Sequence, residues 1–457
     1  MAGRDDERVG EIVAGLAAEH VAIHELPGVA WGVVRGGELI AAHDEASVYR
    51  IASMTKSFTC AAVLALRDDG VFGLDDPIAT HAPELVHIVG PTRDSPPITI
   101  RHLMTMGAGF ATDDAWADRH LDVGDDELDR WLAGGVTFAA PPDTKWEYSN
   151  LGFGFLGRVV LRATSRRVQD HVTEQLLRSL GMRRTTWTAP DDAQPGHRSR
   201  RGDGDEPLLG DGSIAPMGGI FTTVADLARW VSFMLDAWPP RDEPDDAPLA
   251  RASRREMQQV QRAFPPRVVT ARDGRTRTIA GGYGYGLNVT HHDRFGWVVS
   301  HSGGLPGFGS NMRWVPSAGI GIVALSNRTY APMAEFTAAA LDALVAGGEA
   351  EPAPIVPNDN LRRAATQLVE LHDRWDGATA TRLFADNVAL DDSYERRALA
   401  VEAFAAHRPW RLARIEALSA TEGTAIAHGD GAELHVEFQL HPLAPPKVQW
   451  YESKLHS

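Results

Sequence analysis

Short strand patterns lie at both ends of the first 346 residues, whereas the region between them is largely helical. The apolar segments 29–34 and 38–43 are separated by Arg35, Gly36 and Gly37, which is typical of a β-hairpin. Further strand patterns come late, at 297–301, 310–315 and 319–326. Strands at both ends with helices between them predict one antiparallel sheet that the two ends of the domain complete together.

A composition break at 347–360, GGEAEPAPIVPNDN, separates this region from the rest of the chain and predicts an interdomain linker. A chain of 457 residues also exceeds what one hydrophobic core usually organises. After the break, helical patterns come first and strand-like alternation follows, which predicts a small α+β domain over 361–457. We therefore expect a large α/β domain over 1–346, a linker over 347–360 and this small domain.

The charge and the apolar segments exclude several classes of protein. A formal net charge of -16 argues against nucleic acid or an anionic membrane surface as partner, because both demand clustered positive charge. We expect no signal peptide, because acidic residues lie near the N-terminus. We also expect no membrane span, because the apolar runs are far shorter than the roughly 20 residues that cross a bilayer. With Cys60 as the only cysteine, intrachain disulfides are impossible, and we expect a cytoplasmic protein.

Two stretches, 191–212 and 239–248, are rich in Asp, Arg, Gly and Pro and have no periodicity. We interpret them as surface loops. Mobility of the first, and its closure over a substrate, are left open by the sequence.

Lysine is scarce in this chain, and one of the few lysines follows a serine by three residues. Of the 45 basic residues only Lys56, Lys145, Lys447 and Lys454 are lysines. Apolar residues recur at helical spacing after Ser53, so Ser53 is predicted in the first turn of a helix, with Lys56 on the same face. A serine hydroxyl needs a base to become a nucleophile, and lysine, unlike arginine, can be deprotonated when buried. The pair therefore predicts a nucleophile with its base, the alternative being a surface lysine on a helix.

Two distant motifs carry groups that suit the same chemistry. Tyr148 and Asn150 precede a glycine-rich apolar helix; a tyrosine that loses its proton beside cationic Lys56 can act as general base, and an asparagine amide can bind a substrate carbonyl or amide. Further on, His301 and Ser302 are followed by Gly303 and Gly304, and a backbone N–H near Gly304 could join that of Ser53 as an oxyanion hole. For each motif taken alone, a structural role is at least as common.

Together the three motifs, in this order and separation, resemble the serine β-lactamase and penicillin-binding-protein superfamily. The similarity is to its class C-like branch, which includes D-alanyl-D-alanine peptidases, D-aminopeptidases, β-lactamase-like esterases and acyl-transferring peptide cyclases. It extends over roughly residues 8–346 and includes YRIASMTKSFT, LDDPI, ITIRHLMTMGAGF, GGIFTTVADLARW, GGYGYGLNV and HSGGLPGFGSNMRWVP.

The resemblance implies an antiparallel sheet flanked by helices, with a helical subdomain, and an acyl-enzyme mechanism without a cofactor or metal. By matching motifs, Ser53 would be the nucleophile, Lys56 its base and Tyr148 the proton shuttle. Asn150, His301 and Gly303 would contact the substrate, and the backbone N–H groups of Ser53 and Gly304 would form the oxyanion hole. For the small domain, the leading helices favour a cone-shaped fold of the nuclear-transport-factor-2 type, the alternative being a lipocalin-like barrel. This domain could cover the site, select the substrate or form a homo-oligomer.

The third motif departs from the β-lactamase pattern. His301-Ser302-Gly303 stands where true β-lactamases of this branch carry Lys-Thr-Gly. A histidine with its ordinary pKa of about 6.5 is a weaker carboxylate anchor at neutral pH than lysine is. We therefore predict at most slow hydrolysis of β-lactams.

Several other residues have a chemical and a structural interpretation. His291 and His292 are neighbours on a strand and point to opposite faces, so a shared metal is not expected. Lys145 could add positive potential near the site, although a solvated loop lysine is the simpler interpretation. Cys60 is interpreted as a small buried side chain. Four aromatic residues could wall an apolar pocket or pack in the core: Trp116, Trp131, Tyr283 and Tyr285.

Three functions are compatible with these residues. The first is a serine hydrolase that acylates Ser53 with a small-molecule or peptide substrate, cleaving an ester or a peptide/amide bond. The second is an acyltransferase or peptide cyclase that passes the same acyl group to an amine. The third is a binding module that retains the fold without catalysis, which the presence of Ser53, Lys56, Tyr148 and the glycines disfavours.

Overall fold

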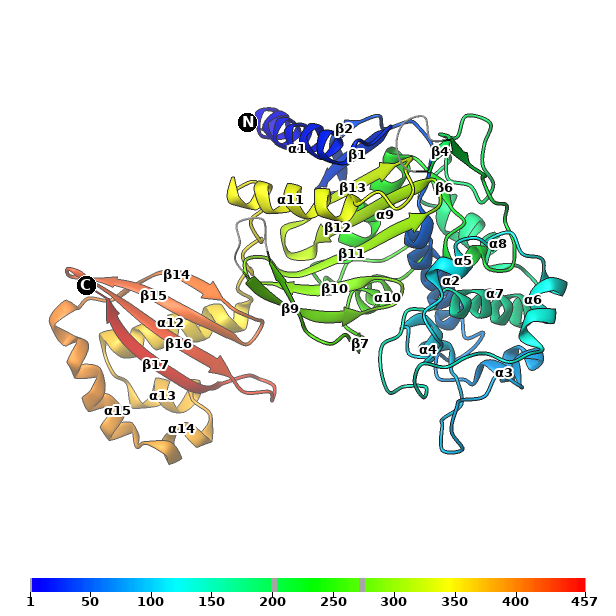
Figure 1. The fold of residues 1–457 in the computed structure, drawn as a ribbon. Coiled ribbons are helices and arrows are strands. Elements are labelled where there is room, and N and C mark those ends of the chain that lie inside the picture. The colour runs from blue at the N-terminus through cyan, green and yellow to red at the C-terminus, as the bar shows by residue number, and fades with distance from the viewer. Residues whose placement is uncertain (1, 199–203, 271–275, 457) are drawn as a thin grey trace. The chain divides into compact units, whose positions relative to one another are not determined.

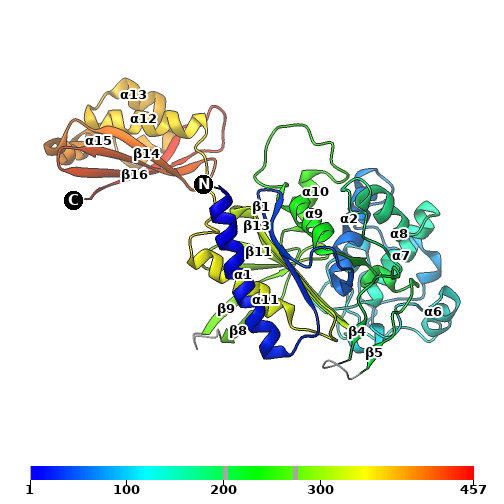
Figure 2. The same cartoon turned by 90° about the horizontal axis from the view of Figure 1, so that it is seen from above.

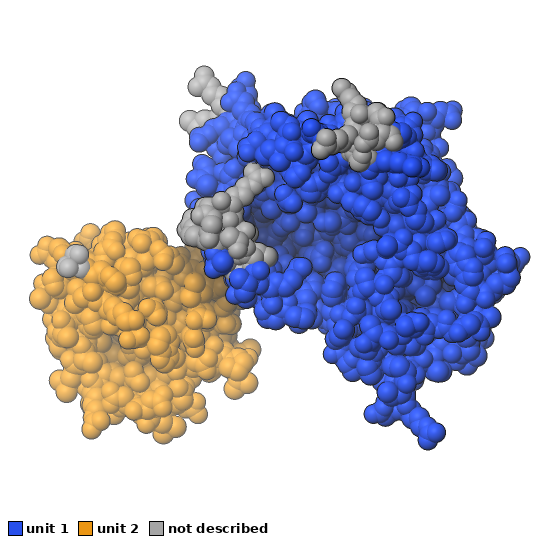
Figure 3. All heavy atoms as spheres, viewed as in Figure 1, with its two compact units in different colours: residues 1–352 blue, residues 353–457 orange. Residues whose placement is uncertain are grey.

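The computed structural model describes residues 2–198, 204–270 and 276–456, and the chain forms two compact units. Unit 1 comprises residues 1–352 and unit 2 residues 353–457 (Figure 3). The division between them falls inside the segment 347–360. The two units are described separately.

The main sheet of unit 1 is closed by the two ends of the domain, as the strand pattern predicts. Among the described residues it has nine strands in the order β2-β1-β13-β12-β11-β10-β9-β7, and β8 pairs with β9. β1 runs antiparallel to β13, with Val29 opposite Ser326. The strands of unit 1 are β1 (Val29–Arg35), β2 (Glu38–His43), β3 (Tyr49–Arg50), β4 (Gly196–His197), β5 (Asp205–Glu206), β6 (Phe221–Thr222), β7 (Arg262–Ala263), β8 (Arg267–Thr270), β9 (Thr276–Tyr283), β10 (Asn288–His292), β11 (Gly296–Leu305), β12 (Phe308–Val315) and β13 (Ile320–Ser326).

The predicted hairpin is formed by β1 and β2. Gly36 and Gly37 connect the strands with φ angles of +58° and +90°. A tight turn with two positive φ angles matches the twist of antiparallel strands, and glycine adopts it without steric cost. The hairpin is confirmed, and β13 pairs with its first strand.

Helices cover both faces of this sheet (Figures 1 and 2). On one face α1 (Ala2–His24) and α11 (Met333–Ala346) lie side by side, and α11 packs on β12 and β13. On the other face α9 (Val224–Leu235) packs against β1 and β13. Each face has its own buried apolar cluster. The sheet is therefore the middle layer of three.

A helical region follows the hairpin in the chain and surrounds α2 (Thr55–Asp68). The fold class expected from the resemblance, an antiparallel sheet flanked by helices with a helical subdomain, is confirmed. The remaining helices of unit 1 are η1 (Ala52–Met54), α3 (Ile78–His81), η2 (Pro83–Leu85), α4 (Ile100–Met104), α5 (Asp114–Ala117), α6 (Asp125–Leu132), α7 (Leu151–Thr164), α8 (Val168–His171), η3 (Val172–Leu177), η4 (Ala215–Met217), α10 (Arg251–Met257) and η5 (Pro316–Ala318).

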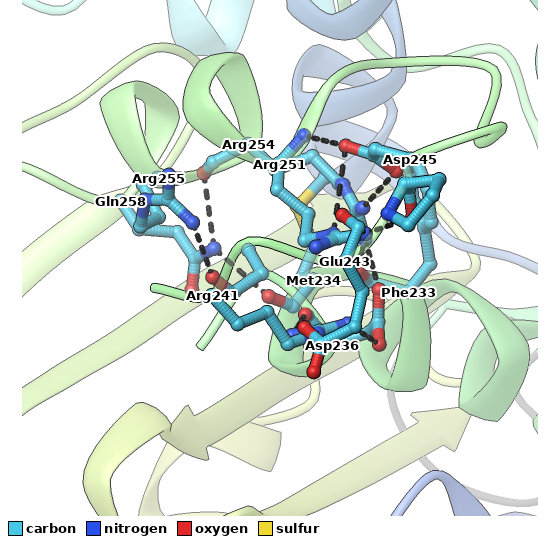
Figure 4. Close-up of polar contacts among 12 residues, drawn as sticks. Phe233, Met234, Asp236, Arg241, Glu243, Asp245, Arg251, Arg254, Arg255 and Gln258 are labelled. Atoms are coloured by element: carbon cyan, nitrogen blue, oxygen red, sulfur yellow. Dashed lines mark hydrogen bonds and ion pairs between the residues drawn. The ribbon is translucent and has the colours of Figure 1, made fainter. Parts of the chain in front are cut away.

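The two segments predicted as surface loops differ in their contacts. In 191–212 the short strands β4 and β5 pair with each other, and residues 199–203 lie outside the described residues. The segment 239–248 is anchored by arginines of α10 (Figure 4). Arg251 donates to the carbonyl oxygen of Glu243 at 2.9 Å, and the fully buried Arg254 contacts Asp236 at 3.0 Å and Asp245 at 3.3 Å. These ion pairs connect α9, the loop and α10.

Unit 2 has its helices first and its strands after them, which confirms the predicted α+β class. Its four strands form an antiparallel sheet in the order β14-β15-β16-β17, and α12 packs across β14 and β15 (Figure 1). The choice between a cone-shaped fold and a barrel stays a prediction. The elements are α12 (Asp359–Asp373), α13 (Gly377–Leu383), α14 (Asp386–Asp391), α15 (Tyr394–Val401), η6 (Glu402–His407), β14 (Arg411–Ala417), β15 (Glu422–Gly429), β16 (Ala432–Leu440) and β17 (Val448–His456).

The helices of the chain differ in length or apolarity from those that cross a bilayer. Across 2–198, 204–270 and 276–456, none is both long and apolar enough to span a membrane.

Candidate active site

Ser53 lies in the short 3-10 helix η1, directly before α2 begins at Thr55. The sequence pattern predicts a first turn of α-helix here, and the structure differs by this tighter turn. Ser53 and Lys56 lie on either side of the junction between η1 and α2, and side chains three residues apart share one face of a helical turn. Lys56 Nζ donates to Ser53 Oγ at 2.9 Å, so the predicted contact is present. Ala52, just before the serine, has a φ of +49°, an uncommon conformation for a residue other than glycine.

The Lys56 amine is fully buried and surrounded by hydrogen-bond acceptors. Besides Ser53, it donates to Asn150 Oδ1 at 2.7 Å and to the Met217 carbonyl oxygen at 3.0 Å. Burial lowers its pKa from 10.5 to about 8, against the charges of Asp114 and other acids, which raise it. An amine with this pKa is partly neutral at neutral pH and can accept a proton.

The Tyr148 ring lies over the same amine, with Lys56 Nζ 4.9 Å from the ring centroid. Burial and the charge of Asp114 raise the Tyr148 pKa well above its ordinary value of 10, although a hydrogen bond with Ser53 acts in the opposite direction. The raised pKa disfavours loss of the Tyr148 proton in the resting protein, and the role of Tyr148 as general base stays a prediction. Of the two groups, Lys56 is the one whose pKa, at about 8, lies near physiological pH.

Asn150 stands at the N-cap position of α7, where its side chain makes no capping hydrogen bond, and it is fully buried. Its amide oxygen accepts from Lys56, and its amide nitrogen donates to Asp114 Oδ1 at 2.8 Å. Asp113 accepts from the backbone N–H groups of Asn150 and Leu151 at 2.7 and 2.8 Å. The Asn150 amide thus holds the base and is itself oriented by an acid, and its contact with a substrate stays a prediction. Sequence reasoning missed both acids, because nothing in their local pattern relates them to position 150.

The third motif lies on β11, beside η1. A Cβ atom at Gly303 would lie 2.0 Å from the Ile51 carbonyl oxygen, so glycine is required for this close approach. A Cβ atom at Gly304 would lie 2.7 Å from the Tyr330 ring. Gly303 therefore brings the strand against the segment that carries Ser53, and Gly304 leaves room for an aromatic ring at the pocket.

Both ring nitrogens of His301 are occupied by hydrogen bonds within the protein. His301 Nδ1 lies 2.6 Å from the Ser302 carbonyl oxygen, which can only accept, so Nδ1 carries the proton. In the neutral ring Nε2 then accepts from the Tyr283 hydroxyl at 2.9 Å. Burial and the nearby charge of Lys56 lower the pKa of His301 to about 3. The expectation of an ordinary histidine pKa is wrong, and the ring offers no positive charge to a substrate carboxylate.

A pocket of about 620 Å³ opens beside Ser53. His301 and Gly304 line it together with Tyr148, so it brings residues of all three motifs to one cavity. Ser302 of the third motif also lines it, and sequence reasoning did not single out the rest of the lining: Asp114, Ala115, Asp118, Trp146, Phe264, Pro265, Arg267, Asn288 and Tyr330.

The other candidate residues have structural surroundings. Lys145 is largely exposed and pairs with Glu147 at 2.8 Å. Cys60 is fully buried, and burial raises the pKa of its thiol well above its ordinary value. In the described ranges no group of three or more His, Cys, Asp or Glu side chains is placed to hold a metal ion. Of the four aromatic candidates, Tyr283 and Tyr285 are buried in the core, and Trp116 packs edge-on to Trp131.

Comparison with known proteins identifies the family to which this sequence is similar. Residues 13–347 match the family model described as Beta-lactamase. The D-alanyl-D-alanine-carboxypeptidase/endopeptidase AmpH of Escherichia coli K12 is 28% identical over 296 residues, which is 64% of this chain and 73% of AmpH.

Two solved structures share the fold. The octameric penicillin-binding protein homologue from Pyrococcus abyssi superposes with a TM-score of 0.60 at 16% identity, covering 96% of this chain and 99% of that one. A class C beta-lactamase superposes with a TM-score of 0.59 at 17% identity, covering 74% of this chain and 97% of that one.

Proposed function

We propose that this chain, which belongs to the β-lactamase family, cleaves ester or amide bonds through Ser53. Its similarity to this family and to AmpH supports a serine hydrolase that forms an acyl-enzyme. The observation that carries the proposal is the 2.9 Å contact between Ser53 Oγ and a buried amine with a pKa of about 8. A nucleophile and a deprotonable base in direct contact are what this chemistry requires.

The proposed reaction begins with transfer of the Ser53 hydroxyl proton to neutral Lys56. Ser53 Oγ then bonds to the substrate carbonyl carbon, and the backbone N–H groups of Ser53 and Gly304 stabilise the oxyanion. Tyr148 passes a proton to the departing alcohol or amine as the scissile bond breaks, which leaves the acyl group on Ser53. Water attacks this ester, loses a proton to the same groups and releases the acid, so that the serine regains its proton.

Asn150 and Gly303 serve this reaction as positioning residues. The Asn150 amide holds the Lys56 amine toward Ser53, and Gly303 keeps β11 close to η1. His301 keeps Tyr283 and the β11 backbone in place and does not bind a carboxylate. We therefore propose an esterase or peptidase with little β-lactamase activity.

The test uses p-nitrophenyl esters and D- and L-amino acid p-nitroanilides, with nitro-product release and intact protein mass as readouts. We expect an acyl adduct on the wild type and none on Ser53→Ala. Added amines separate hydrolysis from transfer, because a transferase would convert most of the acyl group into amide product. If no substrate leaves an adduct and none is turned over, the catalytic proposal is wrong.

The Pyrococcus abyssi homologue is described as octameric, and its fold similarity extends over both units of this chain. We propose that this protein also self-associates. Light scattering of the purified chain gives its mass in solution, and a monomer at micromolar concentration contradicts this proposal.

A further inference from the structure

The charges that line the pocket beside Ser53 are predominantly negative. Asp118, just after α5, and Asp114, within it, contribute two carboxylates. His301 contributes a neutral ring whose nitrogens are both occupied. Arg267 is the lining cation; it is exposed, belongs to β8 and lies over the Phe264 ring at 5.7 Å.

Both carboxylates are held in place by hydrogen bonds that leave acceptor capacity. The Tyr330 hydroxyl donates to Asp118 Oδ2 at 2.7 Å, and the Asn150 amide donates to Asp114 Oδ1 at 2.8 Å. An ionised carboxylate has about four acceptor sites, and each of these bonds uses one of them. The acids can therefore accept hydrogen bonds from a group inside the pocket.

Lys56, whose charge acts on Asp118, is already committed elsewhere. The Lys56 amine is directed to Ser53, Asn150 and the Met217 carbonyl oxygen, and it has no exposed surface. Burial raises the pKa of Asp118 to about 7, and a bound cation would favour its ionised form.

We propose that the pocket selects acyl groups that carry an ammonium group, and that Asp118, assisted by Asp114, is the specificity-determining residue that receives it. This inference rests on the proposed acyl-enzyme at Ser53. A cationic third motif would bind a carboxylate of the substrate. In this chain, acidic residues on another wall of the same pocket would instead bind a positively charged group.

The test compares three p-nitrophenyl esters of similar length. One is the heptanoate, one carries an ammonium group in place of the terminal methyl, and one is the hydrogen adipate, which ends in a carboxylate. We expect kcat/KM to be at least about tenfold higher for the ammonium ester than for the heptanoate, and lowest for the adipate. The preference should weaken as salt is added, because screening acts on charge recognition and not on chemistry.

Asp118→Asn keeps the shape of the side chain and should reduce the ratio of ammonium to heptanoate ester to within about threefold. Comparing ratios cancels any effect of the substitution on chemistry that the two esters share. Asp126→Asn removes the same charge from an exposed position in α6 and should leave the ratio as in the wild type. If Asp118→Asn fails to fold, Asp114→Asn and the salt series on the wild type provide the same comparison.

The outcomes separate the inference from the function on which it rests. If the heptanoate leaves no adduct on Ser53, the acyl-enzyme proposal itself fails. If all three esters acylate Ser53 at similar rates, or if the adipate is preferred, the enzyme is real but selection by Asp118 is refuted. Preference for the adipate would transfer the selecting role to Arg267.

Discussion

The pKa of Lys56 makes the strongest quantitative prediction for this protein. Burial lowers it from 10.5 to about 8. At pH 7 about 9% of the amine is then neutral, roughly 300-fold more than at the ordinary pKa. Because the lowered pKa lies above neutral pH, the neutral form of Lys56 is lost as the pH falls below 8. At a pH well above 8, nearly all of the amine is neutral. We expect kcat/KM to rise about tenfold per pH unit from 6 to 7 and to level off above about 8.

Lys56→Arg removes the deprotonable group and keeps the charge. Arginine stays protonated below pH 12, so we expect kcat/KM to fall by about 10²–10⁴-fold, the usual contribution of a general base. Lys145→Arg, an exposed lysine paired with Glu147, is the matched control and should retain wild-type activity.

The assay is hydrolysis of p-nitrophenyl heptanoate between pH 5.5 and 9.5, since this ester has no ionisable group of its own in that range. Background hydrolysis is subtracted with Ser53→Ala. A profile that is flat between pH 6 and 8, or a Lys56→Arg protein with more than a tenth of wild-type kcat/KM, would refute the assignment of Lys56 as the base.

Three further predictions concern other parts of unit 1. A chromogenic cephalosporin should be hydrolysed slowly at every pH from 5 to 9, because a His301 with a pKa of about 3 stays neutral throughout; rapid turnover that increases toward pH 5 would contradict this. Gly303→Ala places a Cβ atom 2.0 Å from the Ile51 carbonyl oxygen and should lower both the melting temperature and the activity. Gly15 lies on α1 with open space around its Cβ position, so Gly15→Ala should raise the free energy of unfolding in urea by about 0.5–1 kcal/mol. Arg254→Met should lower the free energy of unfolding of unit 1 by about 2–3 kcal/mol, less than for a fully buried ion pair because Asp236 is half exposed. Arg241 pairs with the same carboxylate and is more exposed, so Arg241→Met should cost under about 1 kcal/mol. Equal costs for the two substitutions would mean that burial of the arginine does not determine the strength of the ion pair.

Local chain geometry made much of the fold and part of the site predictable. Two adjacent glycines between apolar segments specify a hairpin, and strand patterns at both ends of the domain leave few ways to complete a sheet. Ser53 and Lys56 are three residues apart, so any helical turn brings their side chains together. These features depend on residues that are close in the sequence, so one sequence is enough to predict them.

The protonation states of the site were not predictable, because they depend on burial and on residues far apart in the chain. His301 has the same sequence context whether its ring is solvated or enclosed, and only burial in the fold and the nearby charge of Lys56 fix it as neutral. The long helix α1 was also not anticipated, since it packs against β2 and against α11, which begins more than 300 residues later.

The acids beside Lys56 connect the choice of substrate to the strength of the base. Burial lowers the Lys56 pKa, and Asp114 and Asp118 raise it, so the value near 8 is a balance between the two effects. An ammonium group bound at these acids would offset their charge, and the Lys56 pKa would fall further while that substrate is bound. A larger fraction of the base would then be neutral at pH 7. In single-turnover acylation at saturating ester, the ammonium ester should therefore show its acid limb at lower pH than the heptanoate. Coincident limbs would mean that the acids tune Lys56 without sensing the substrate.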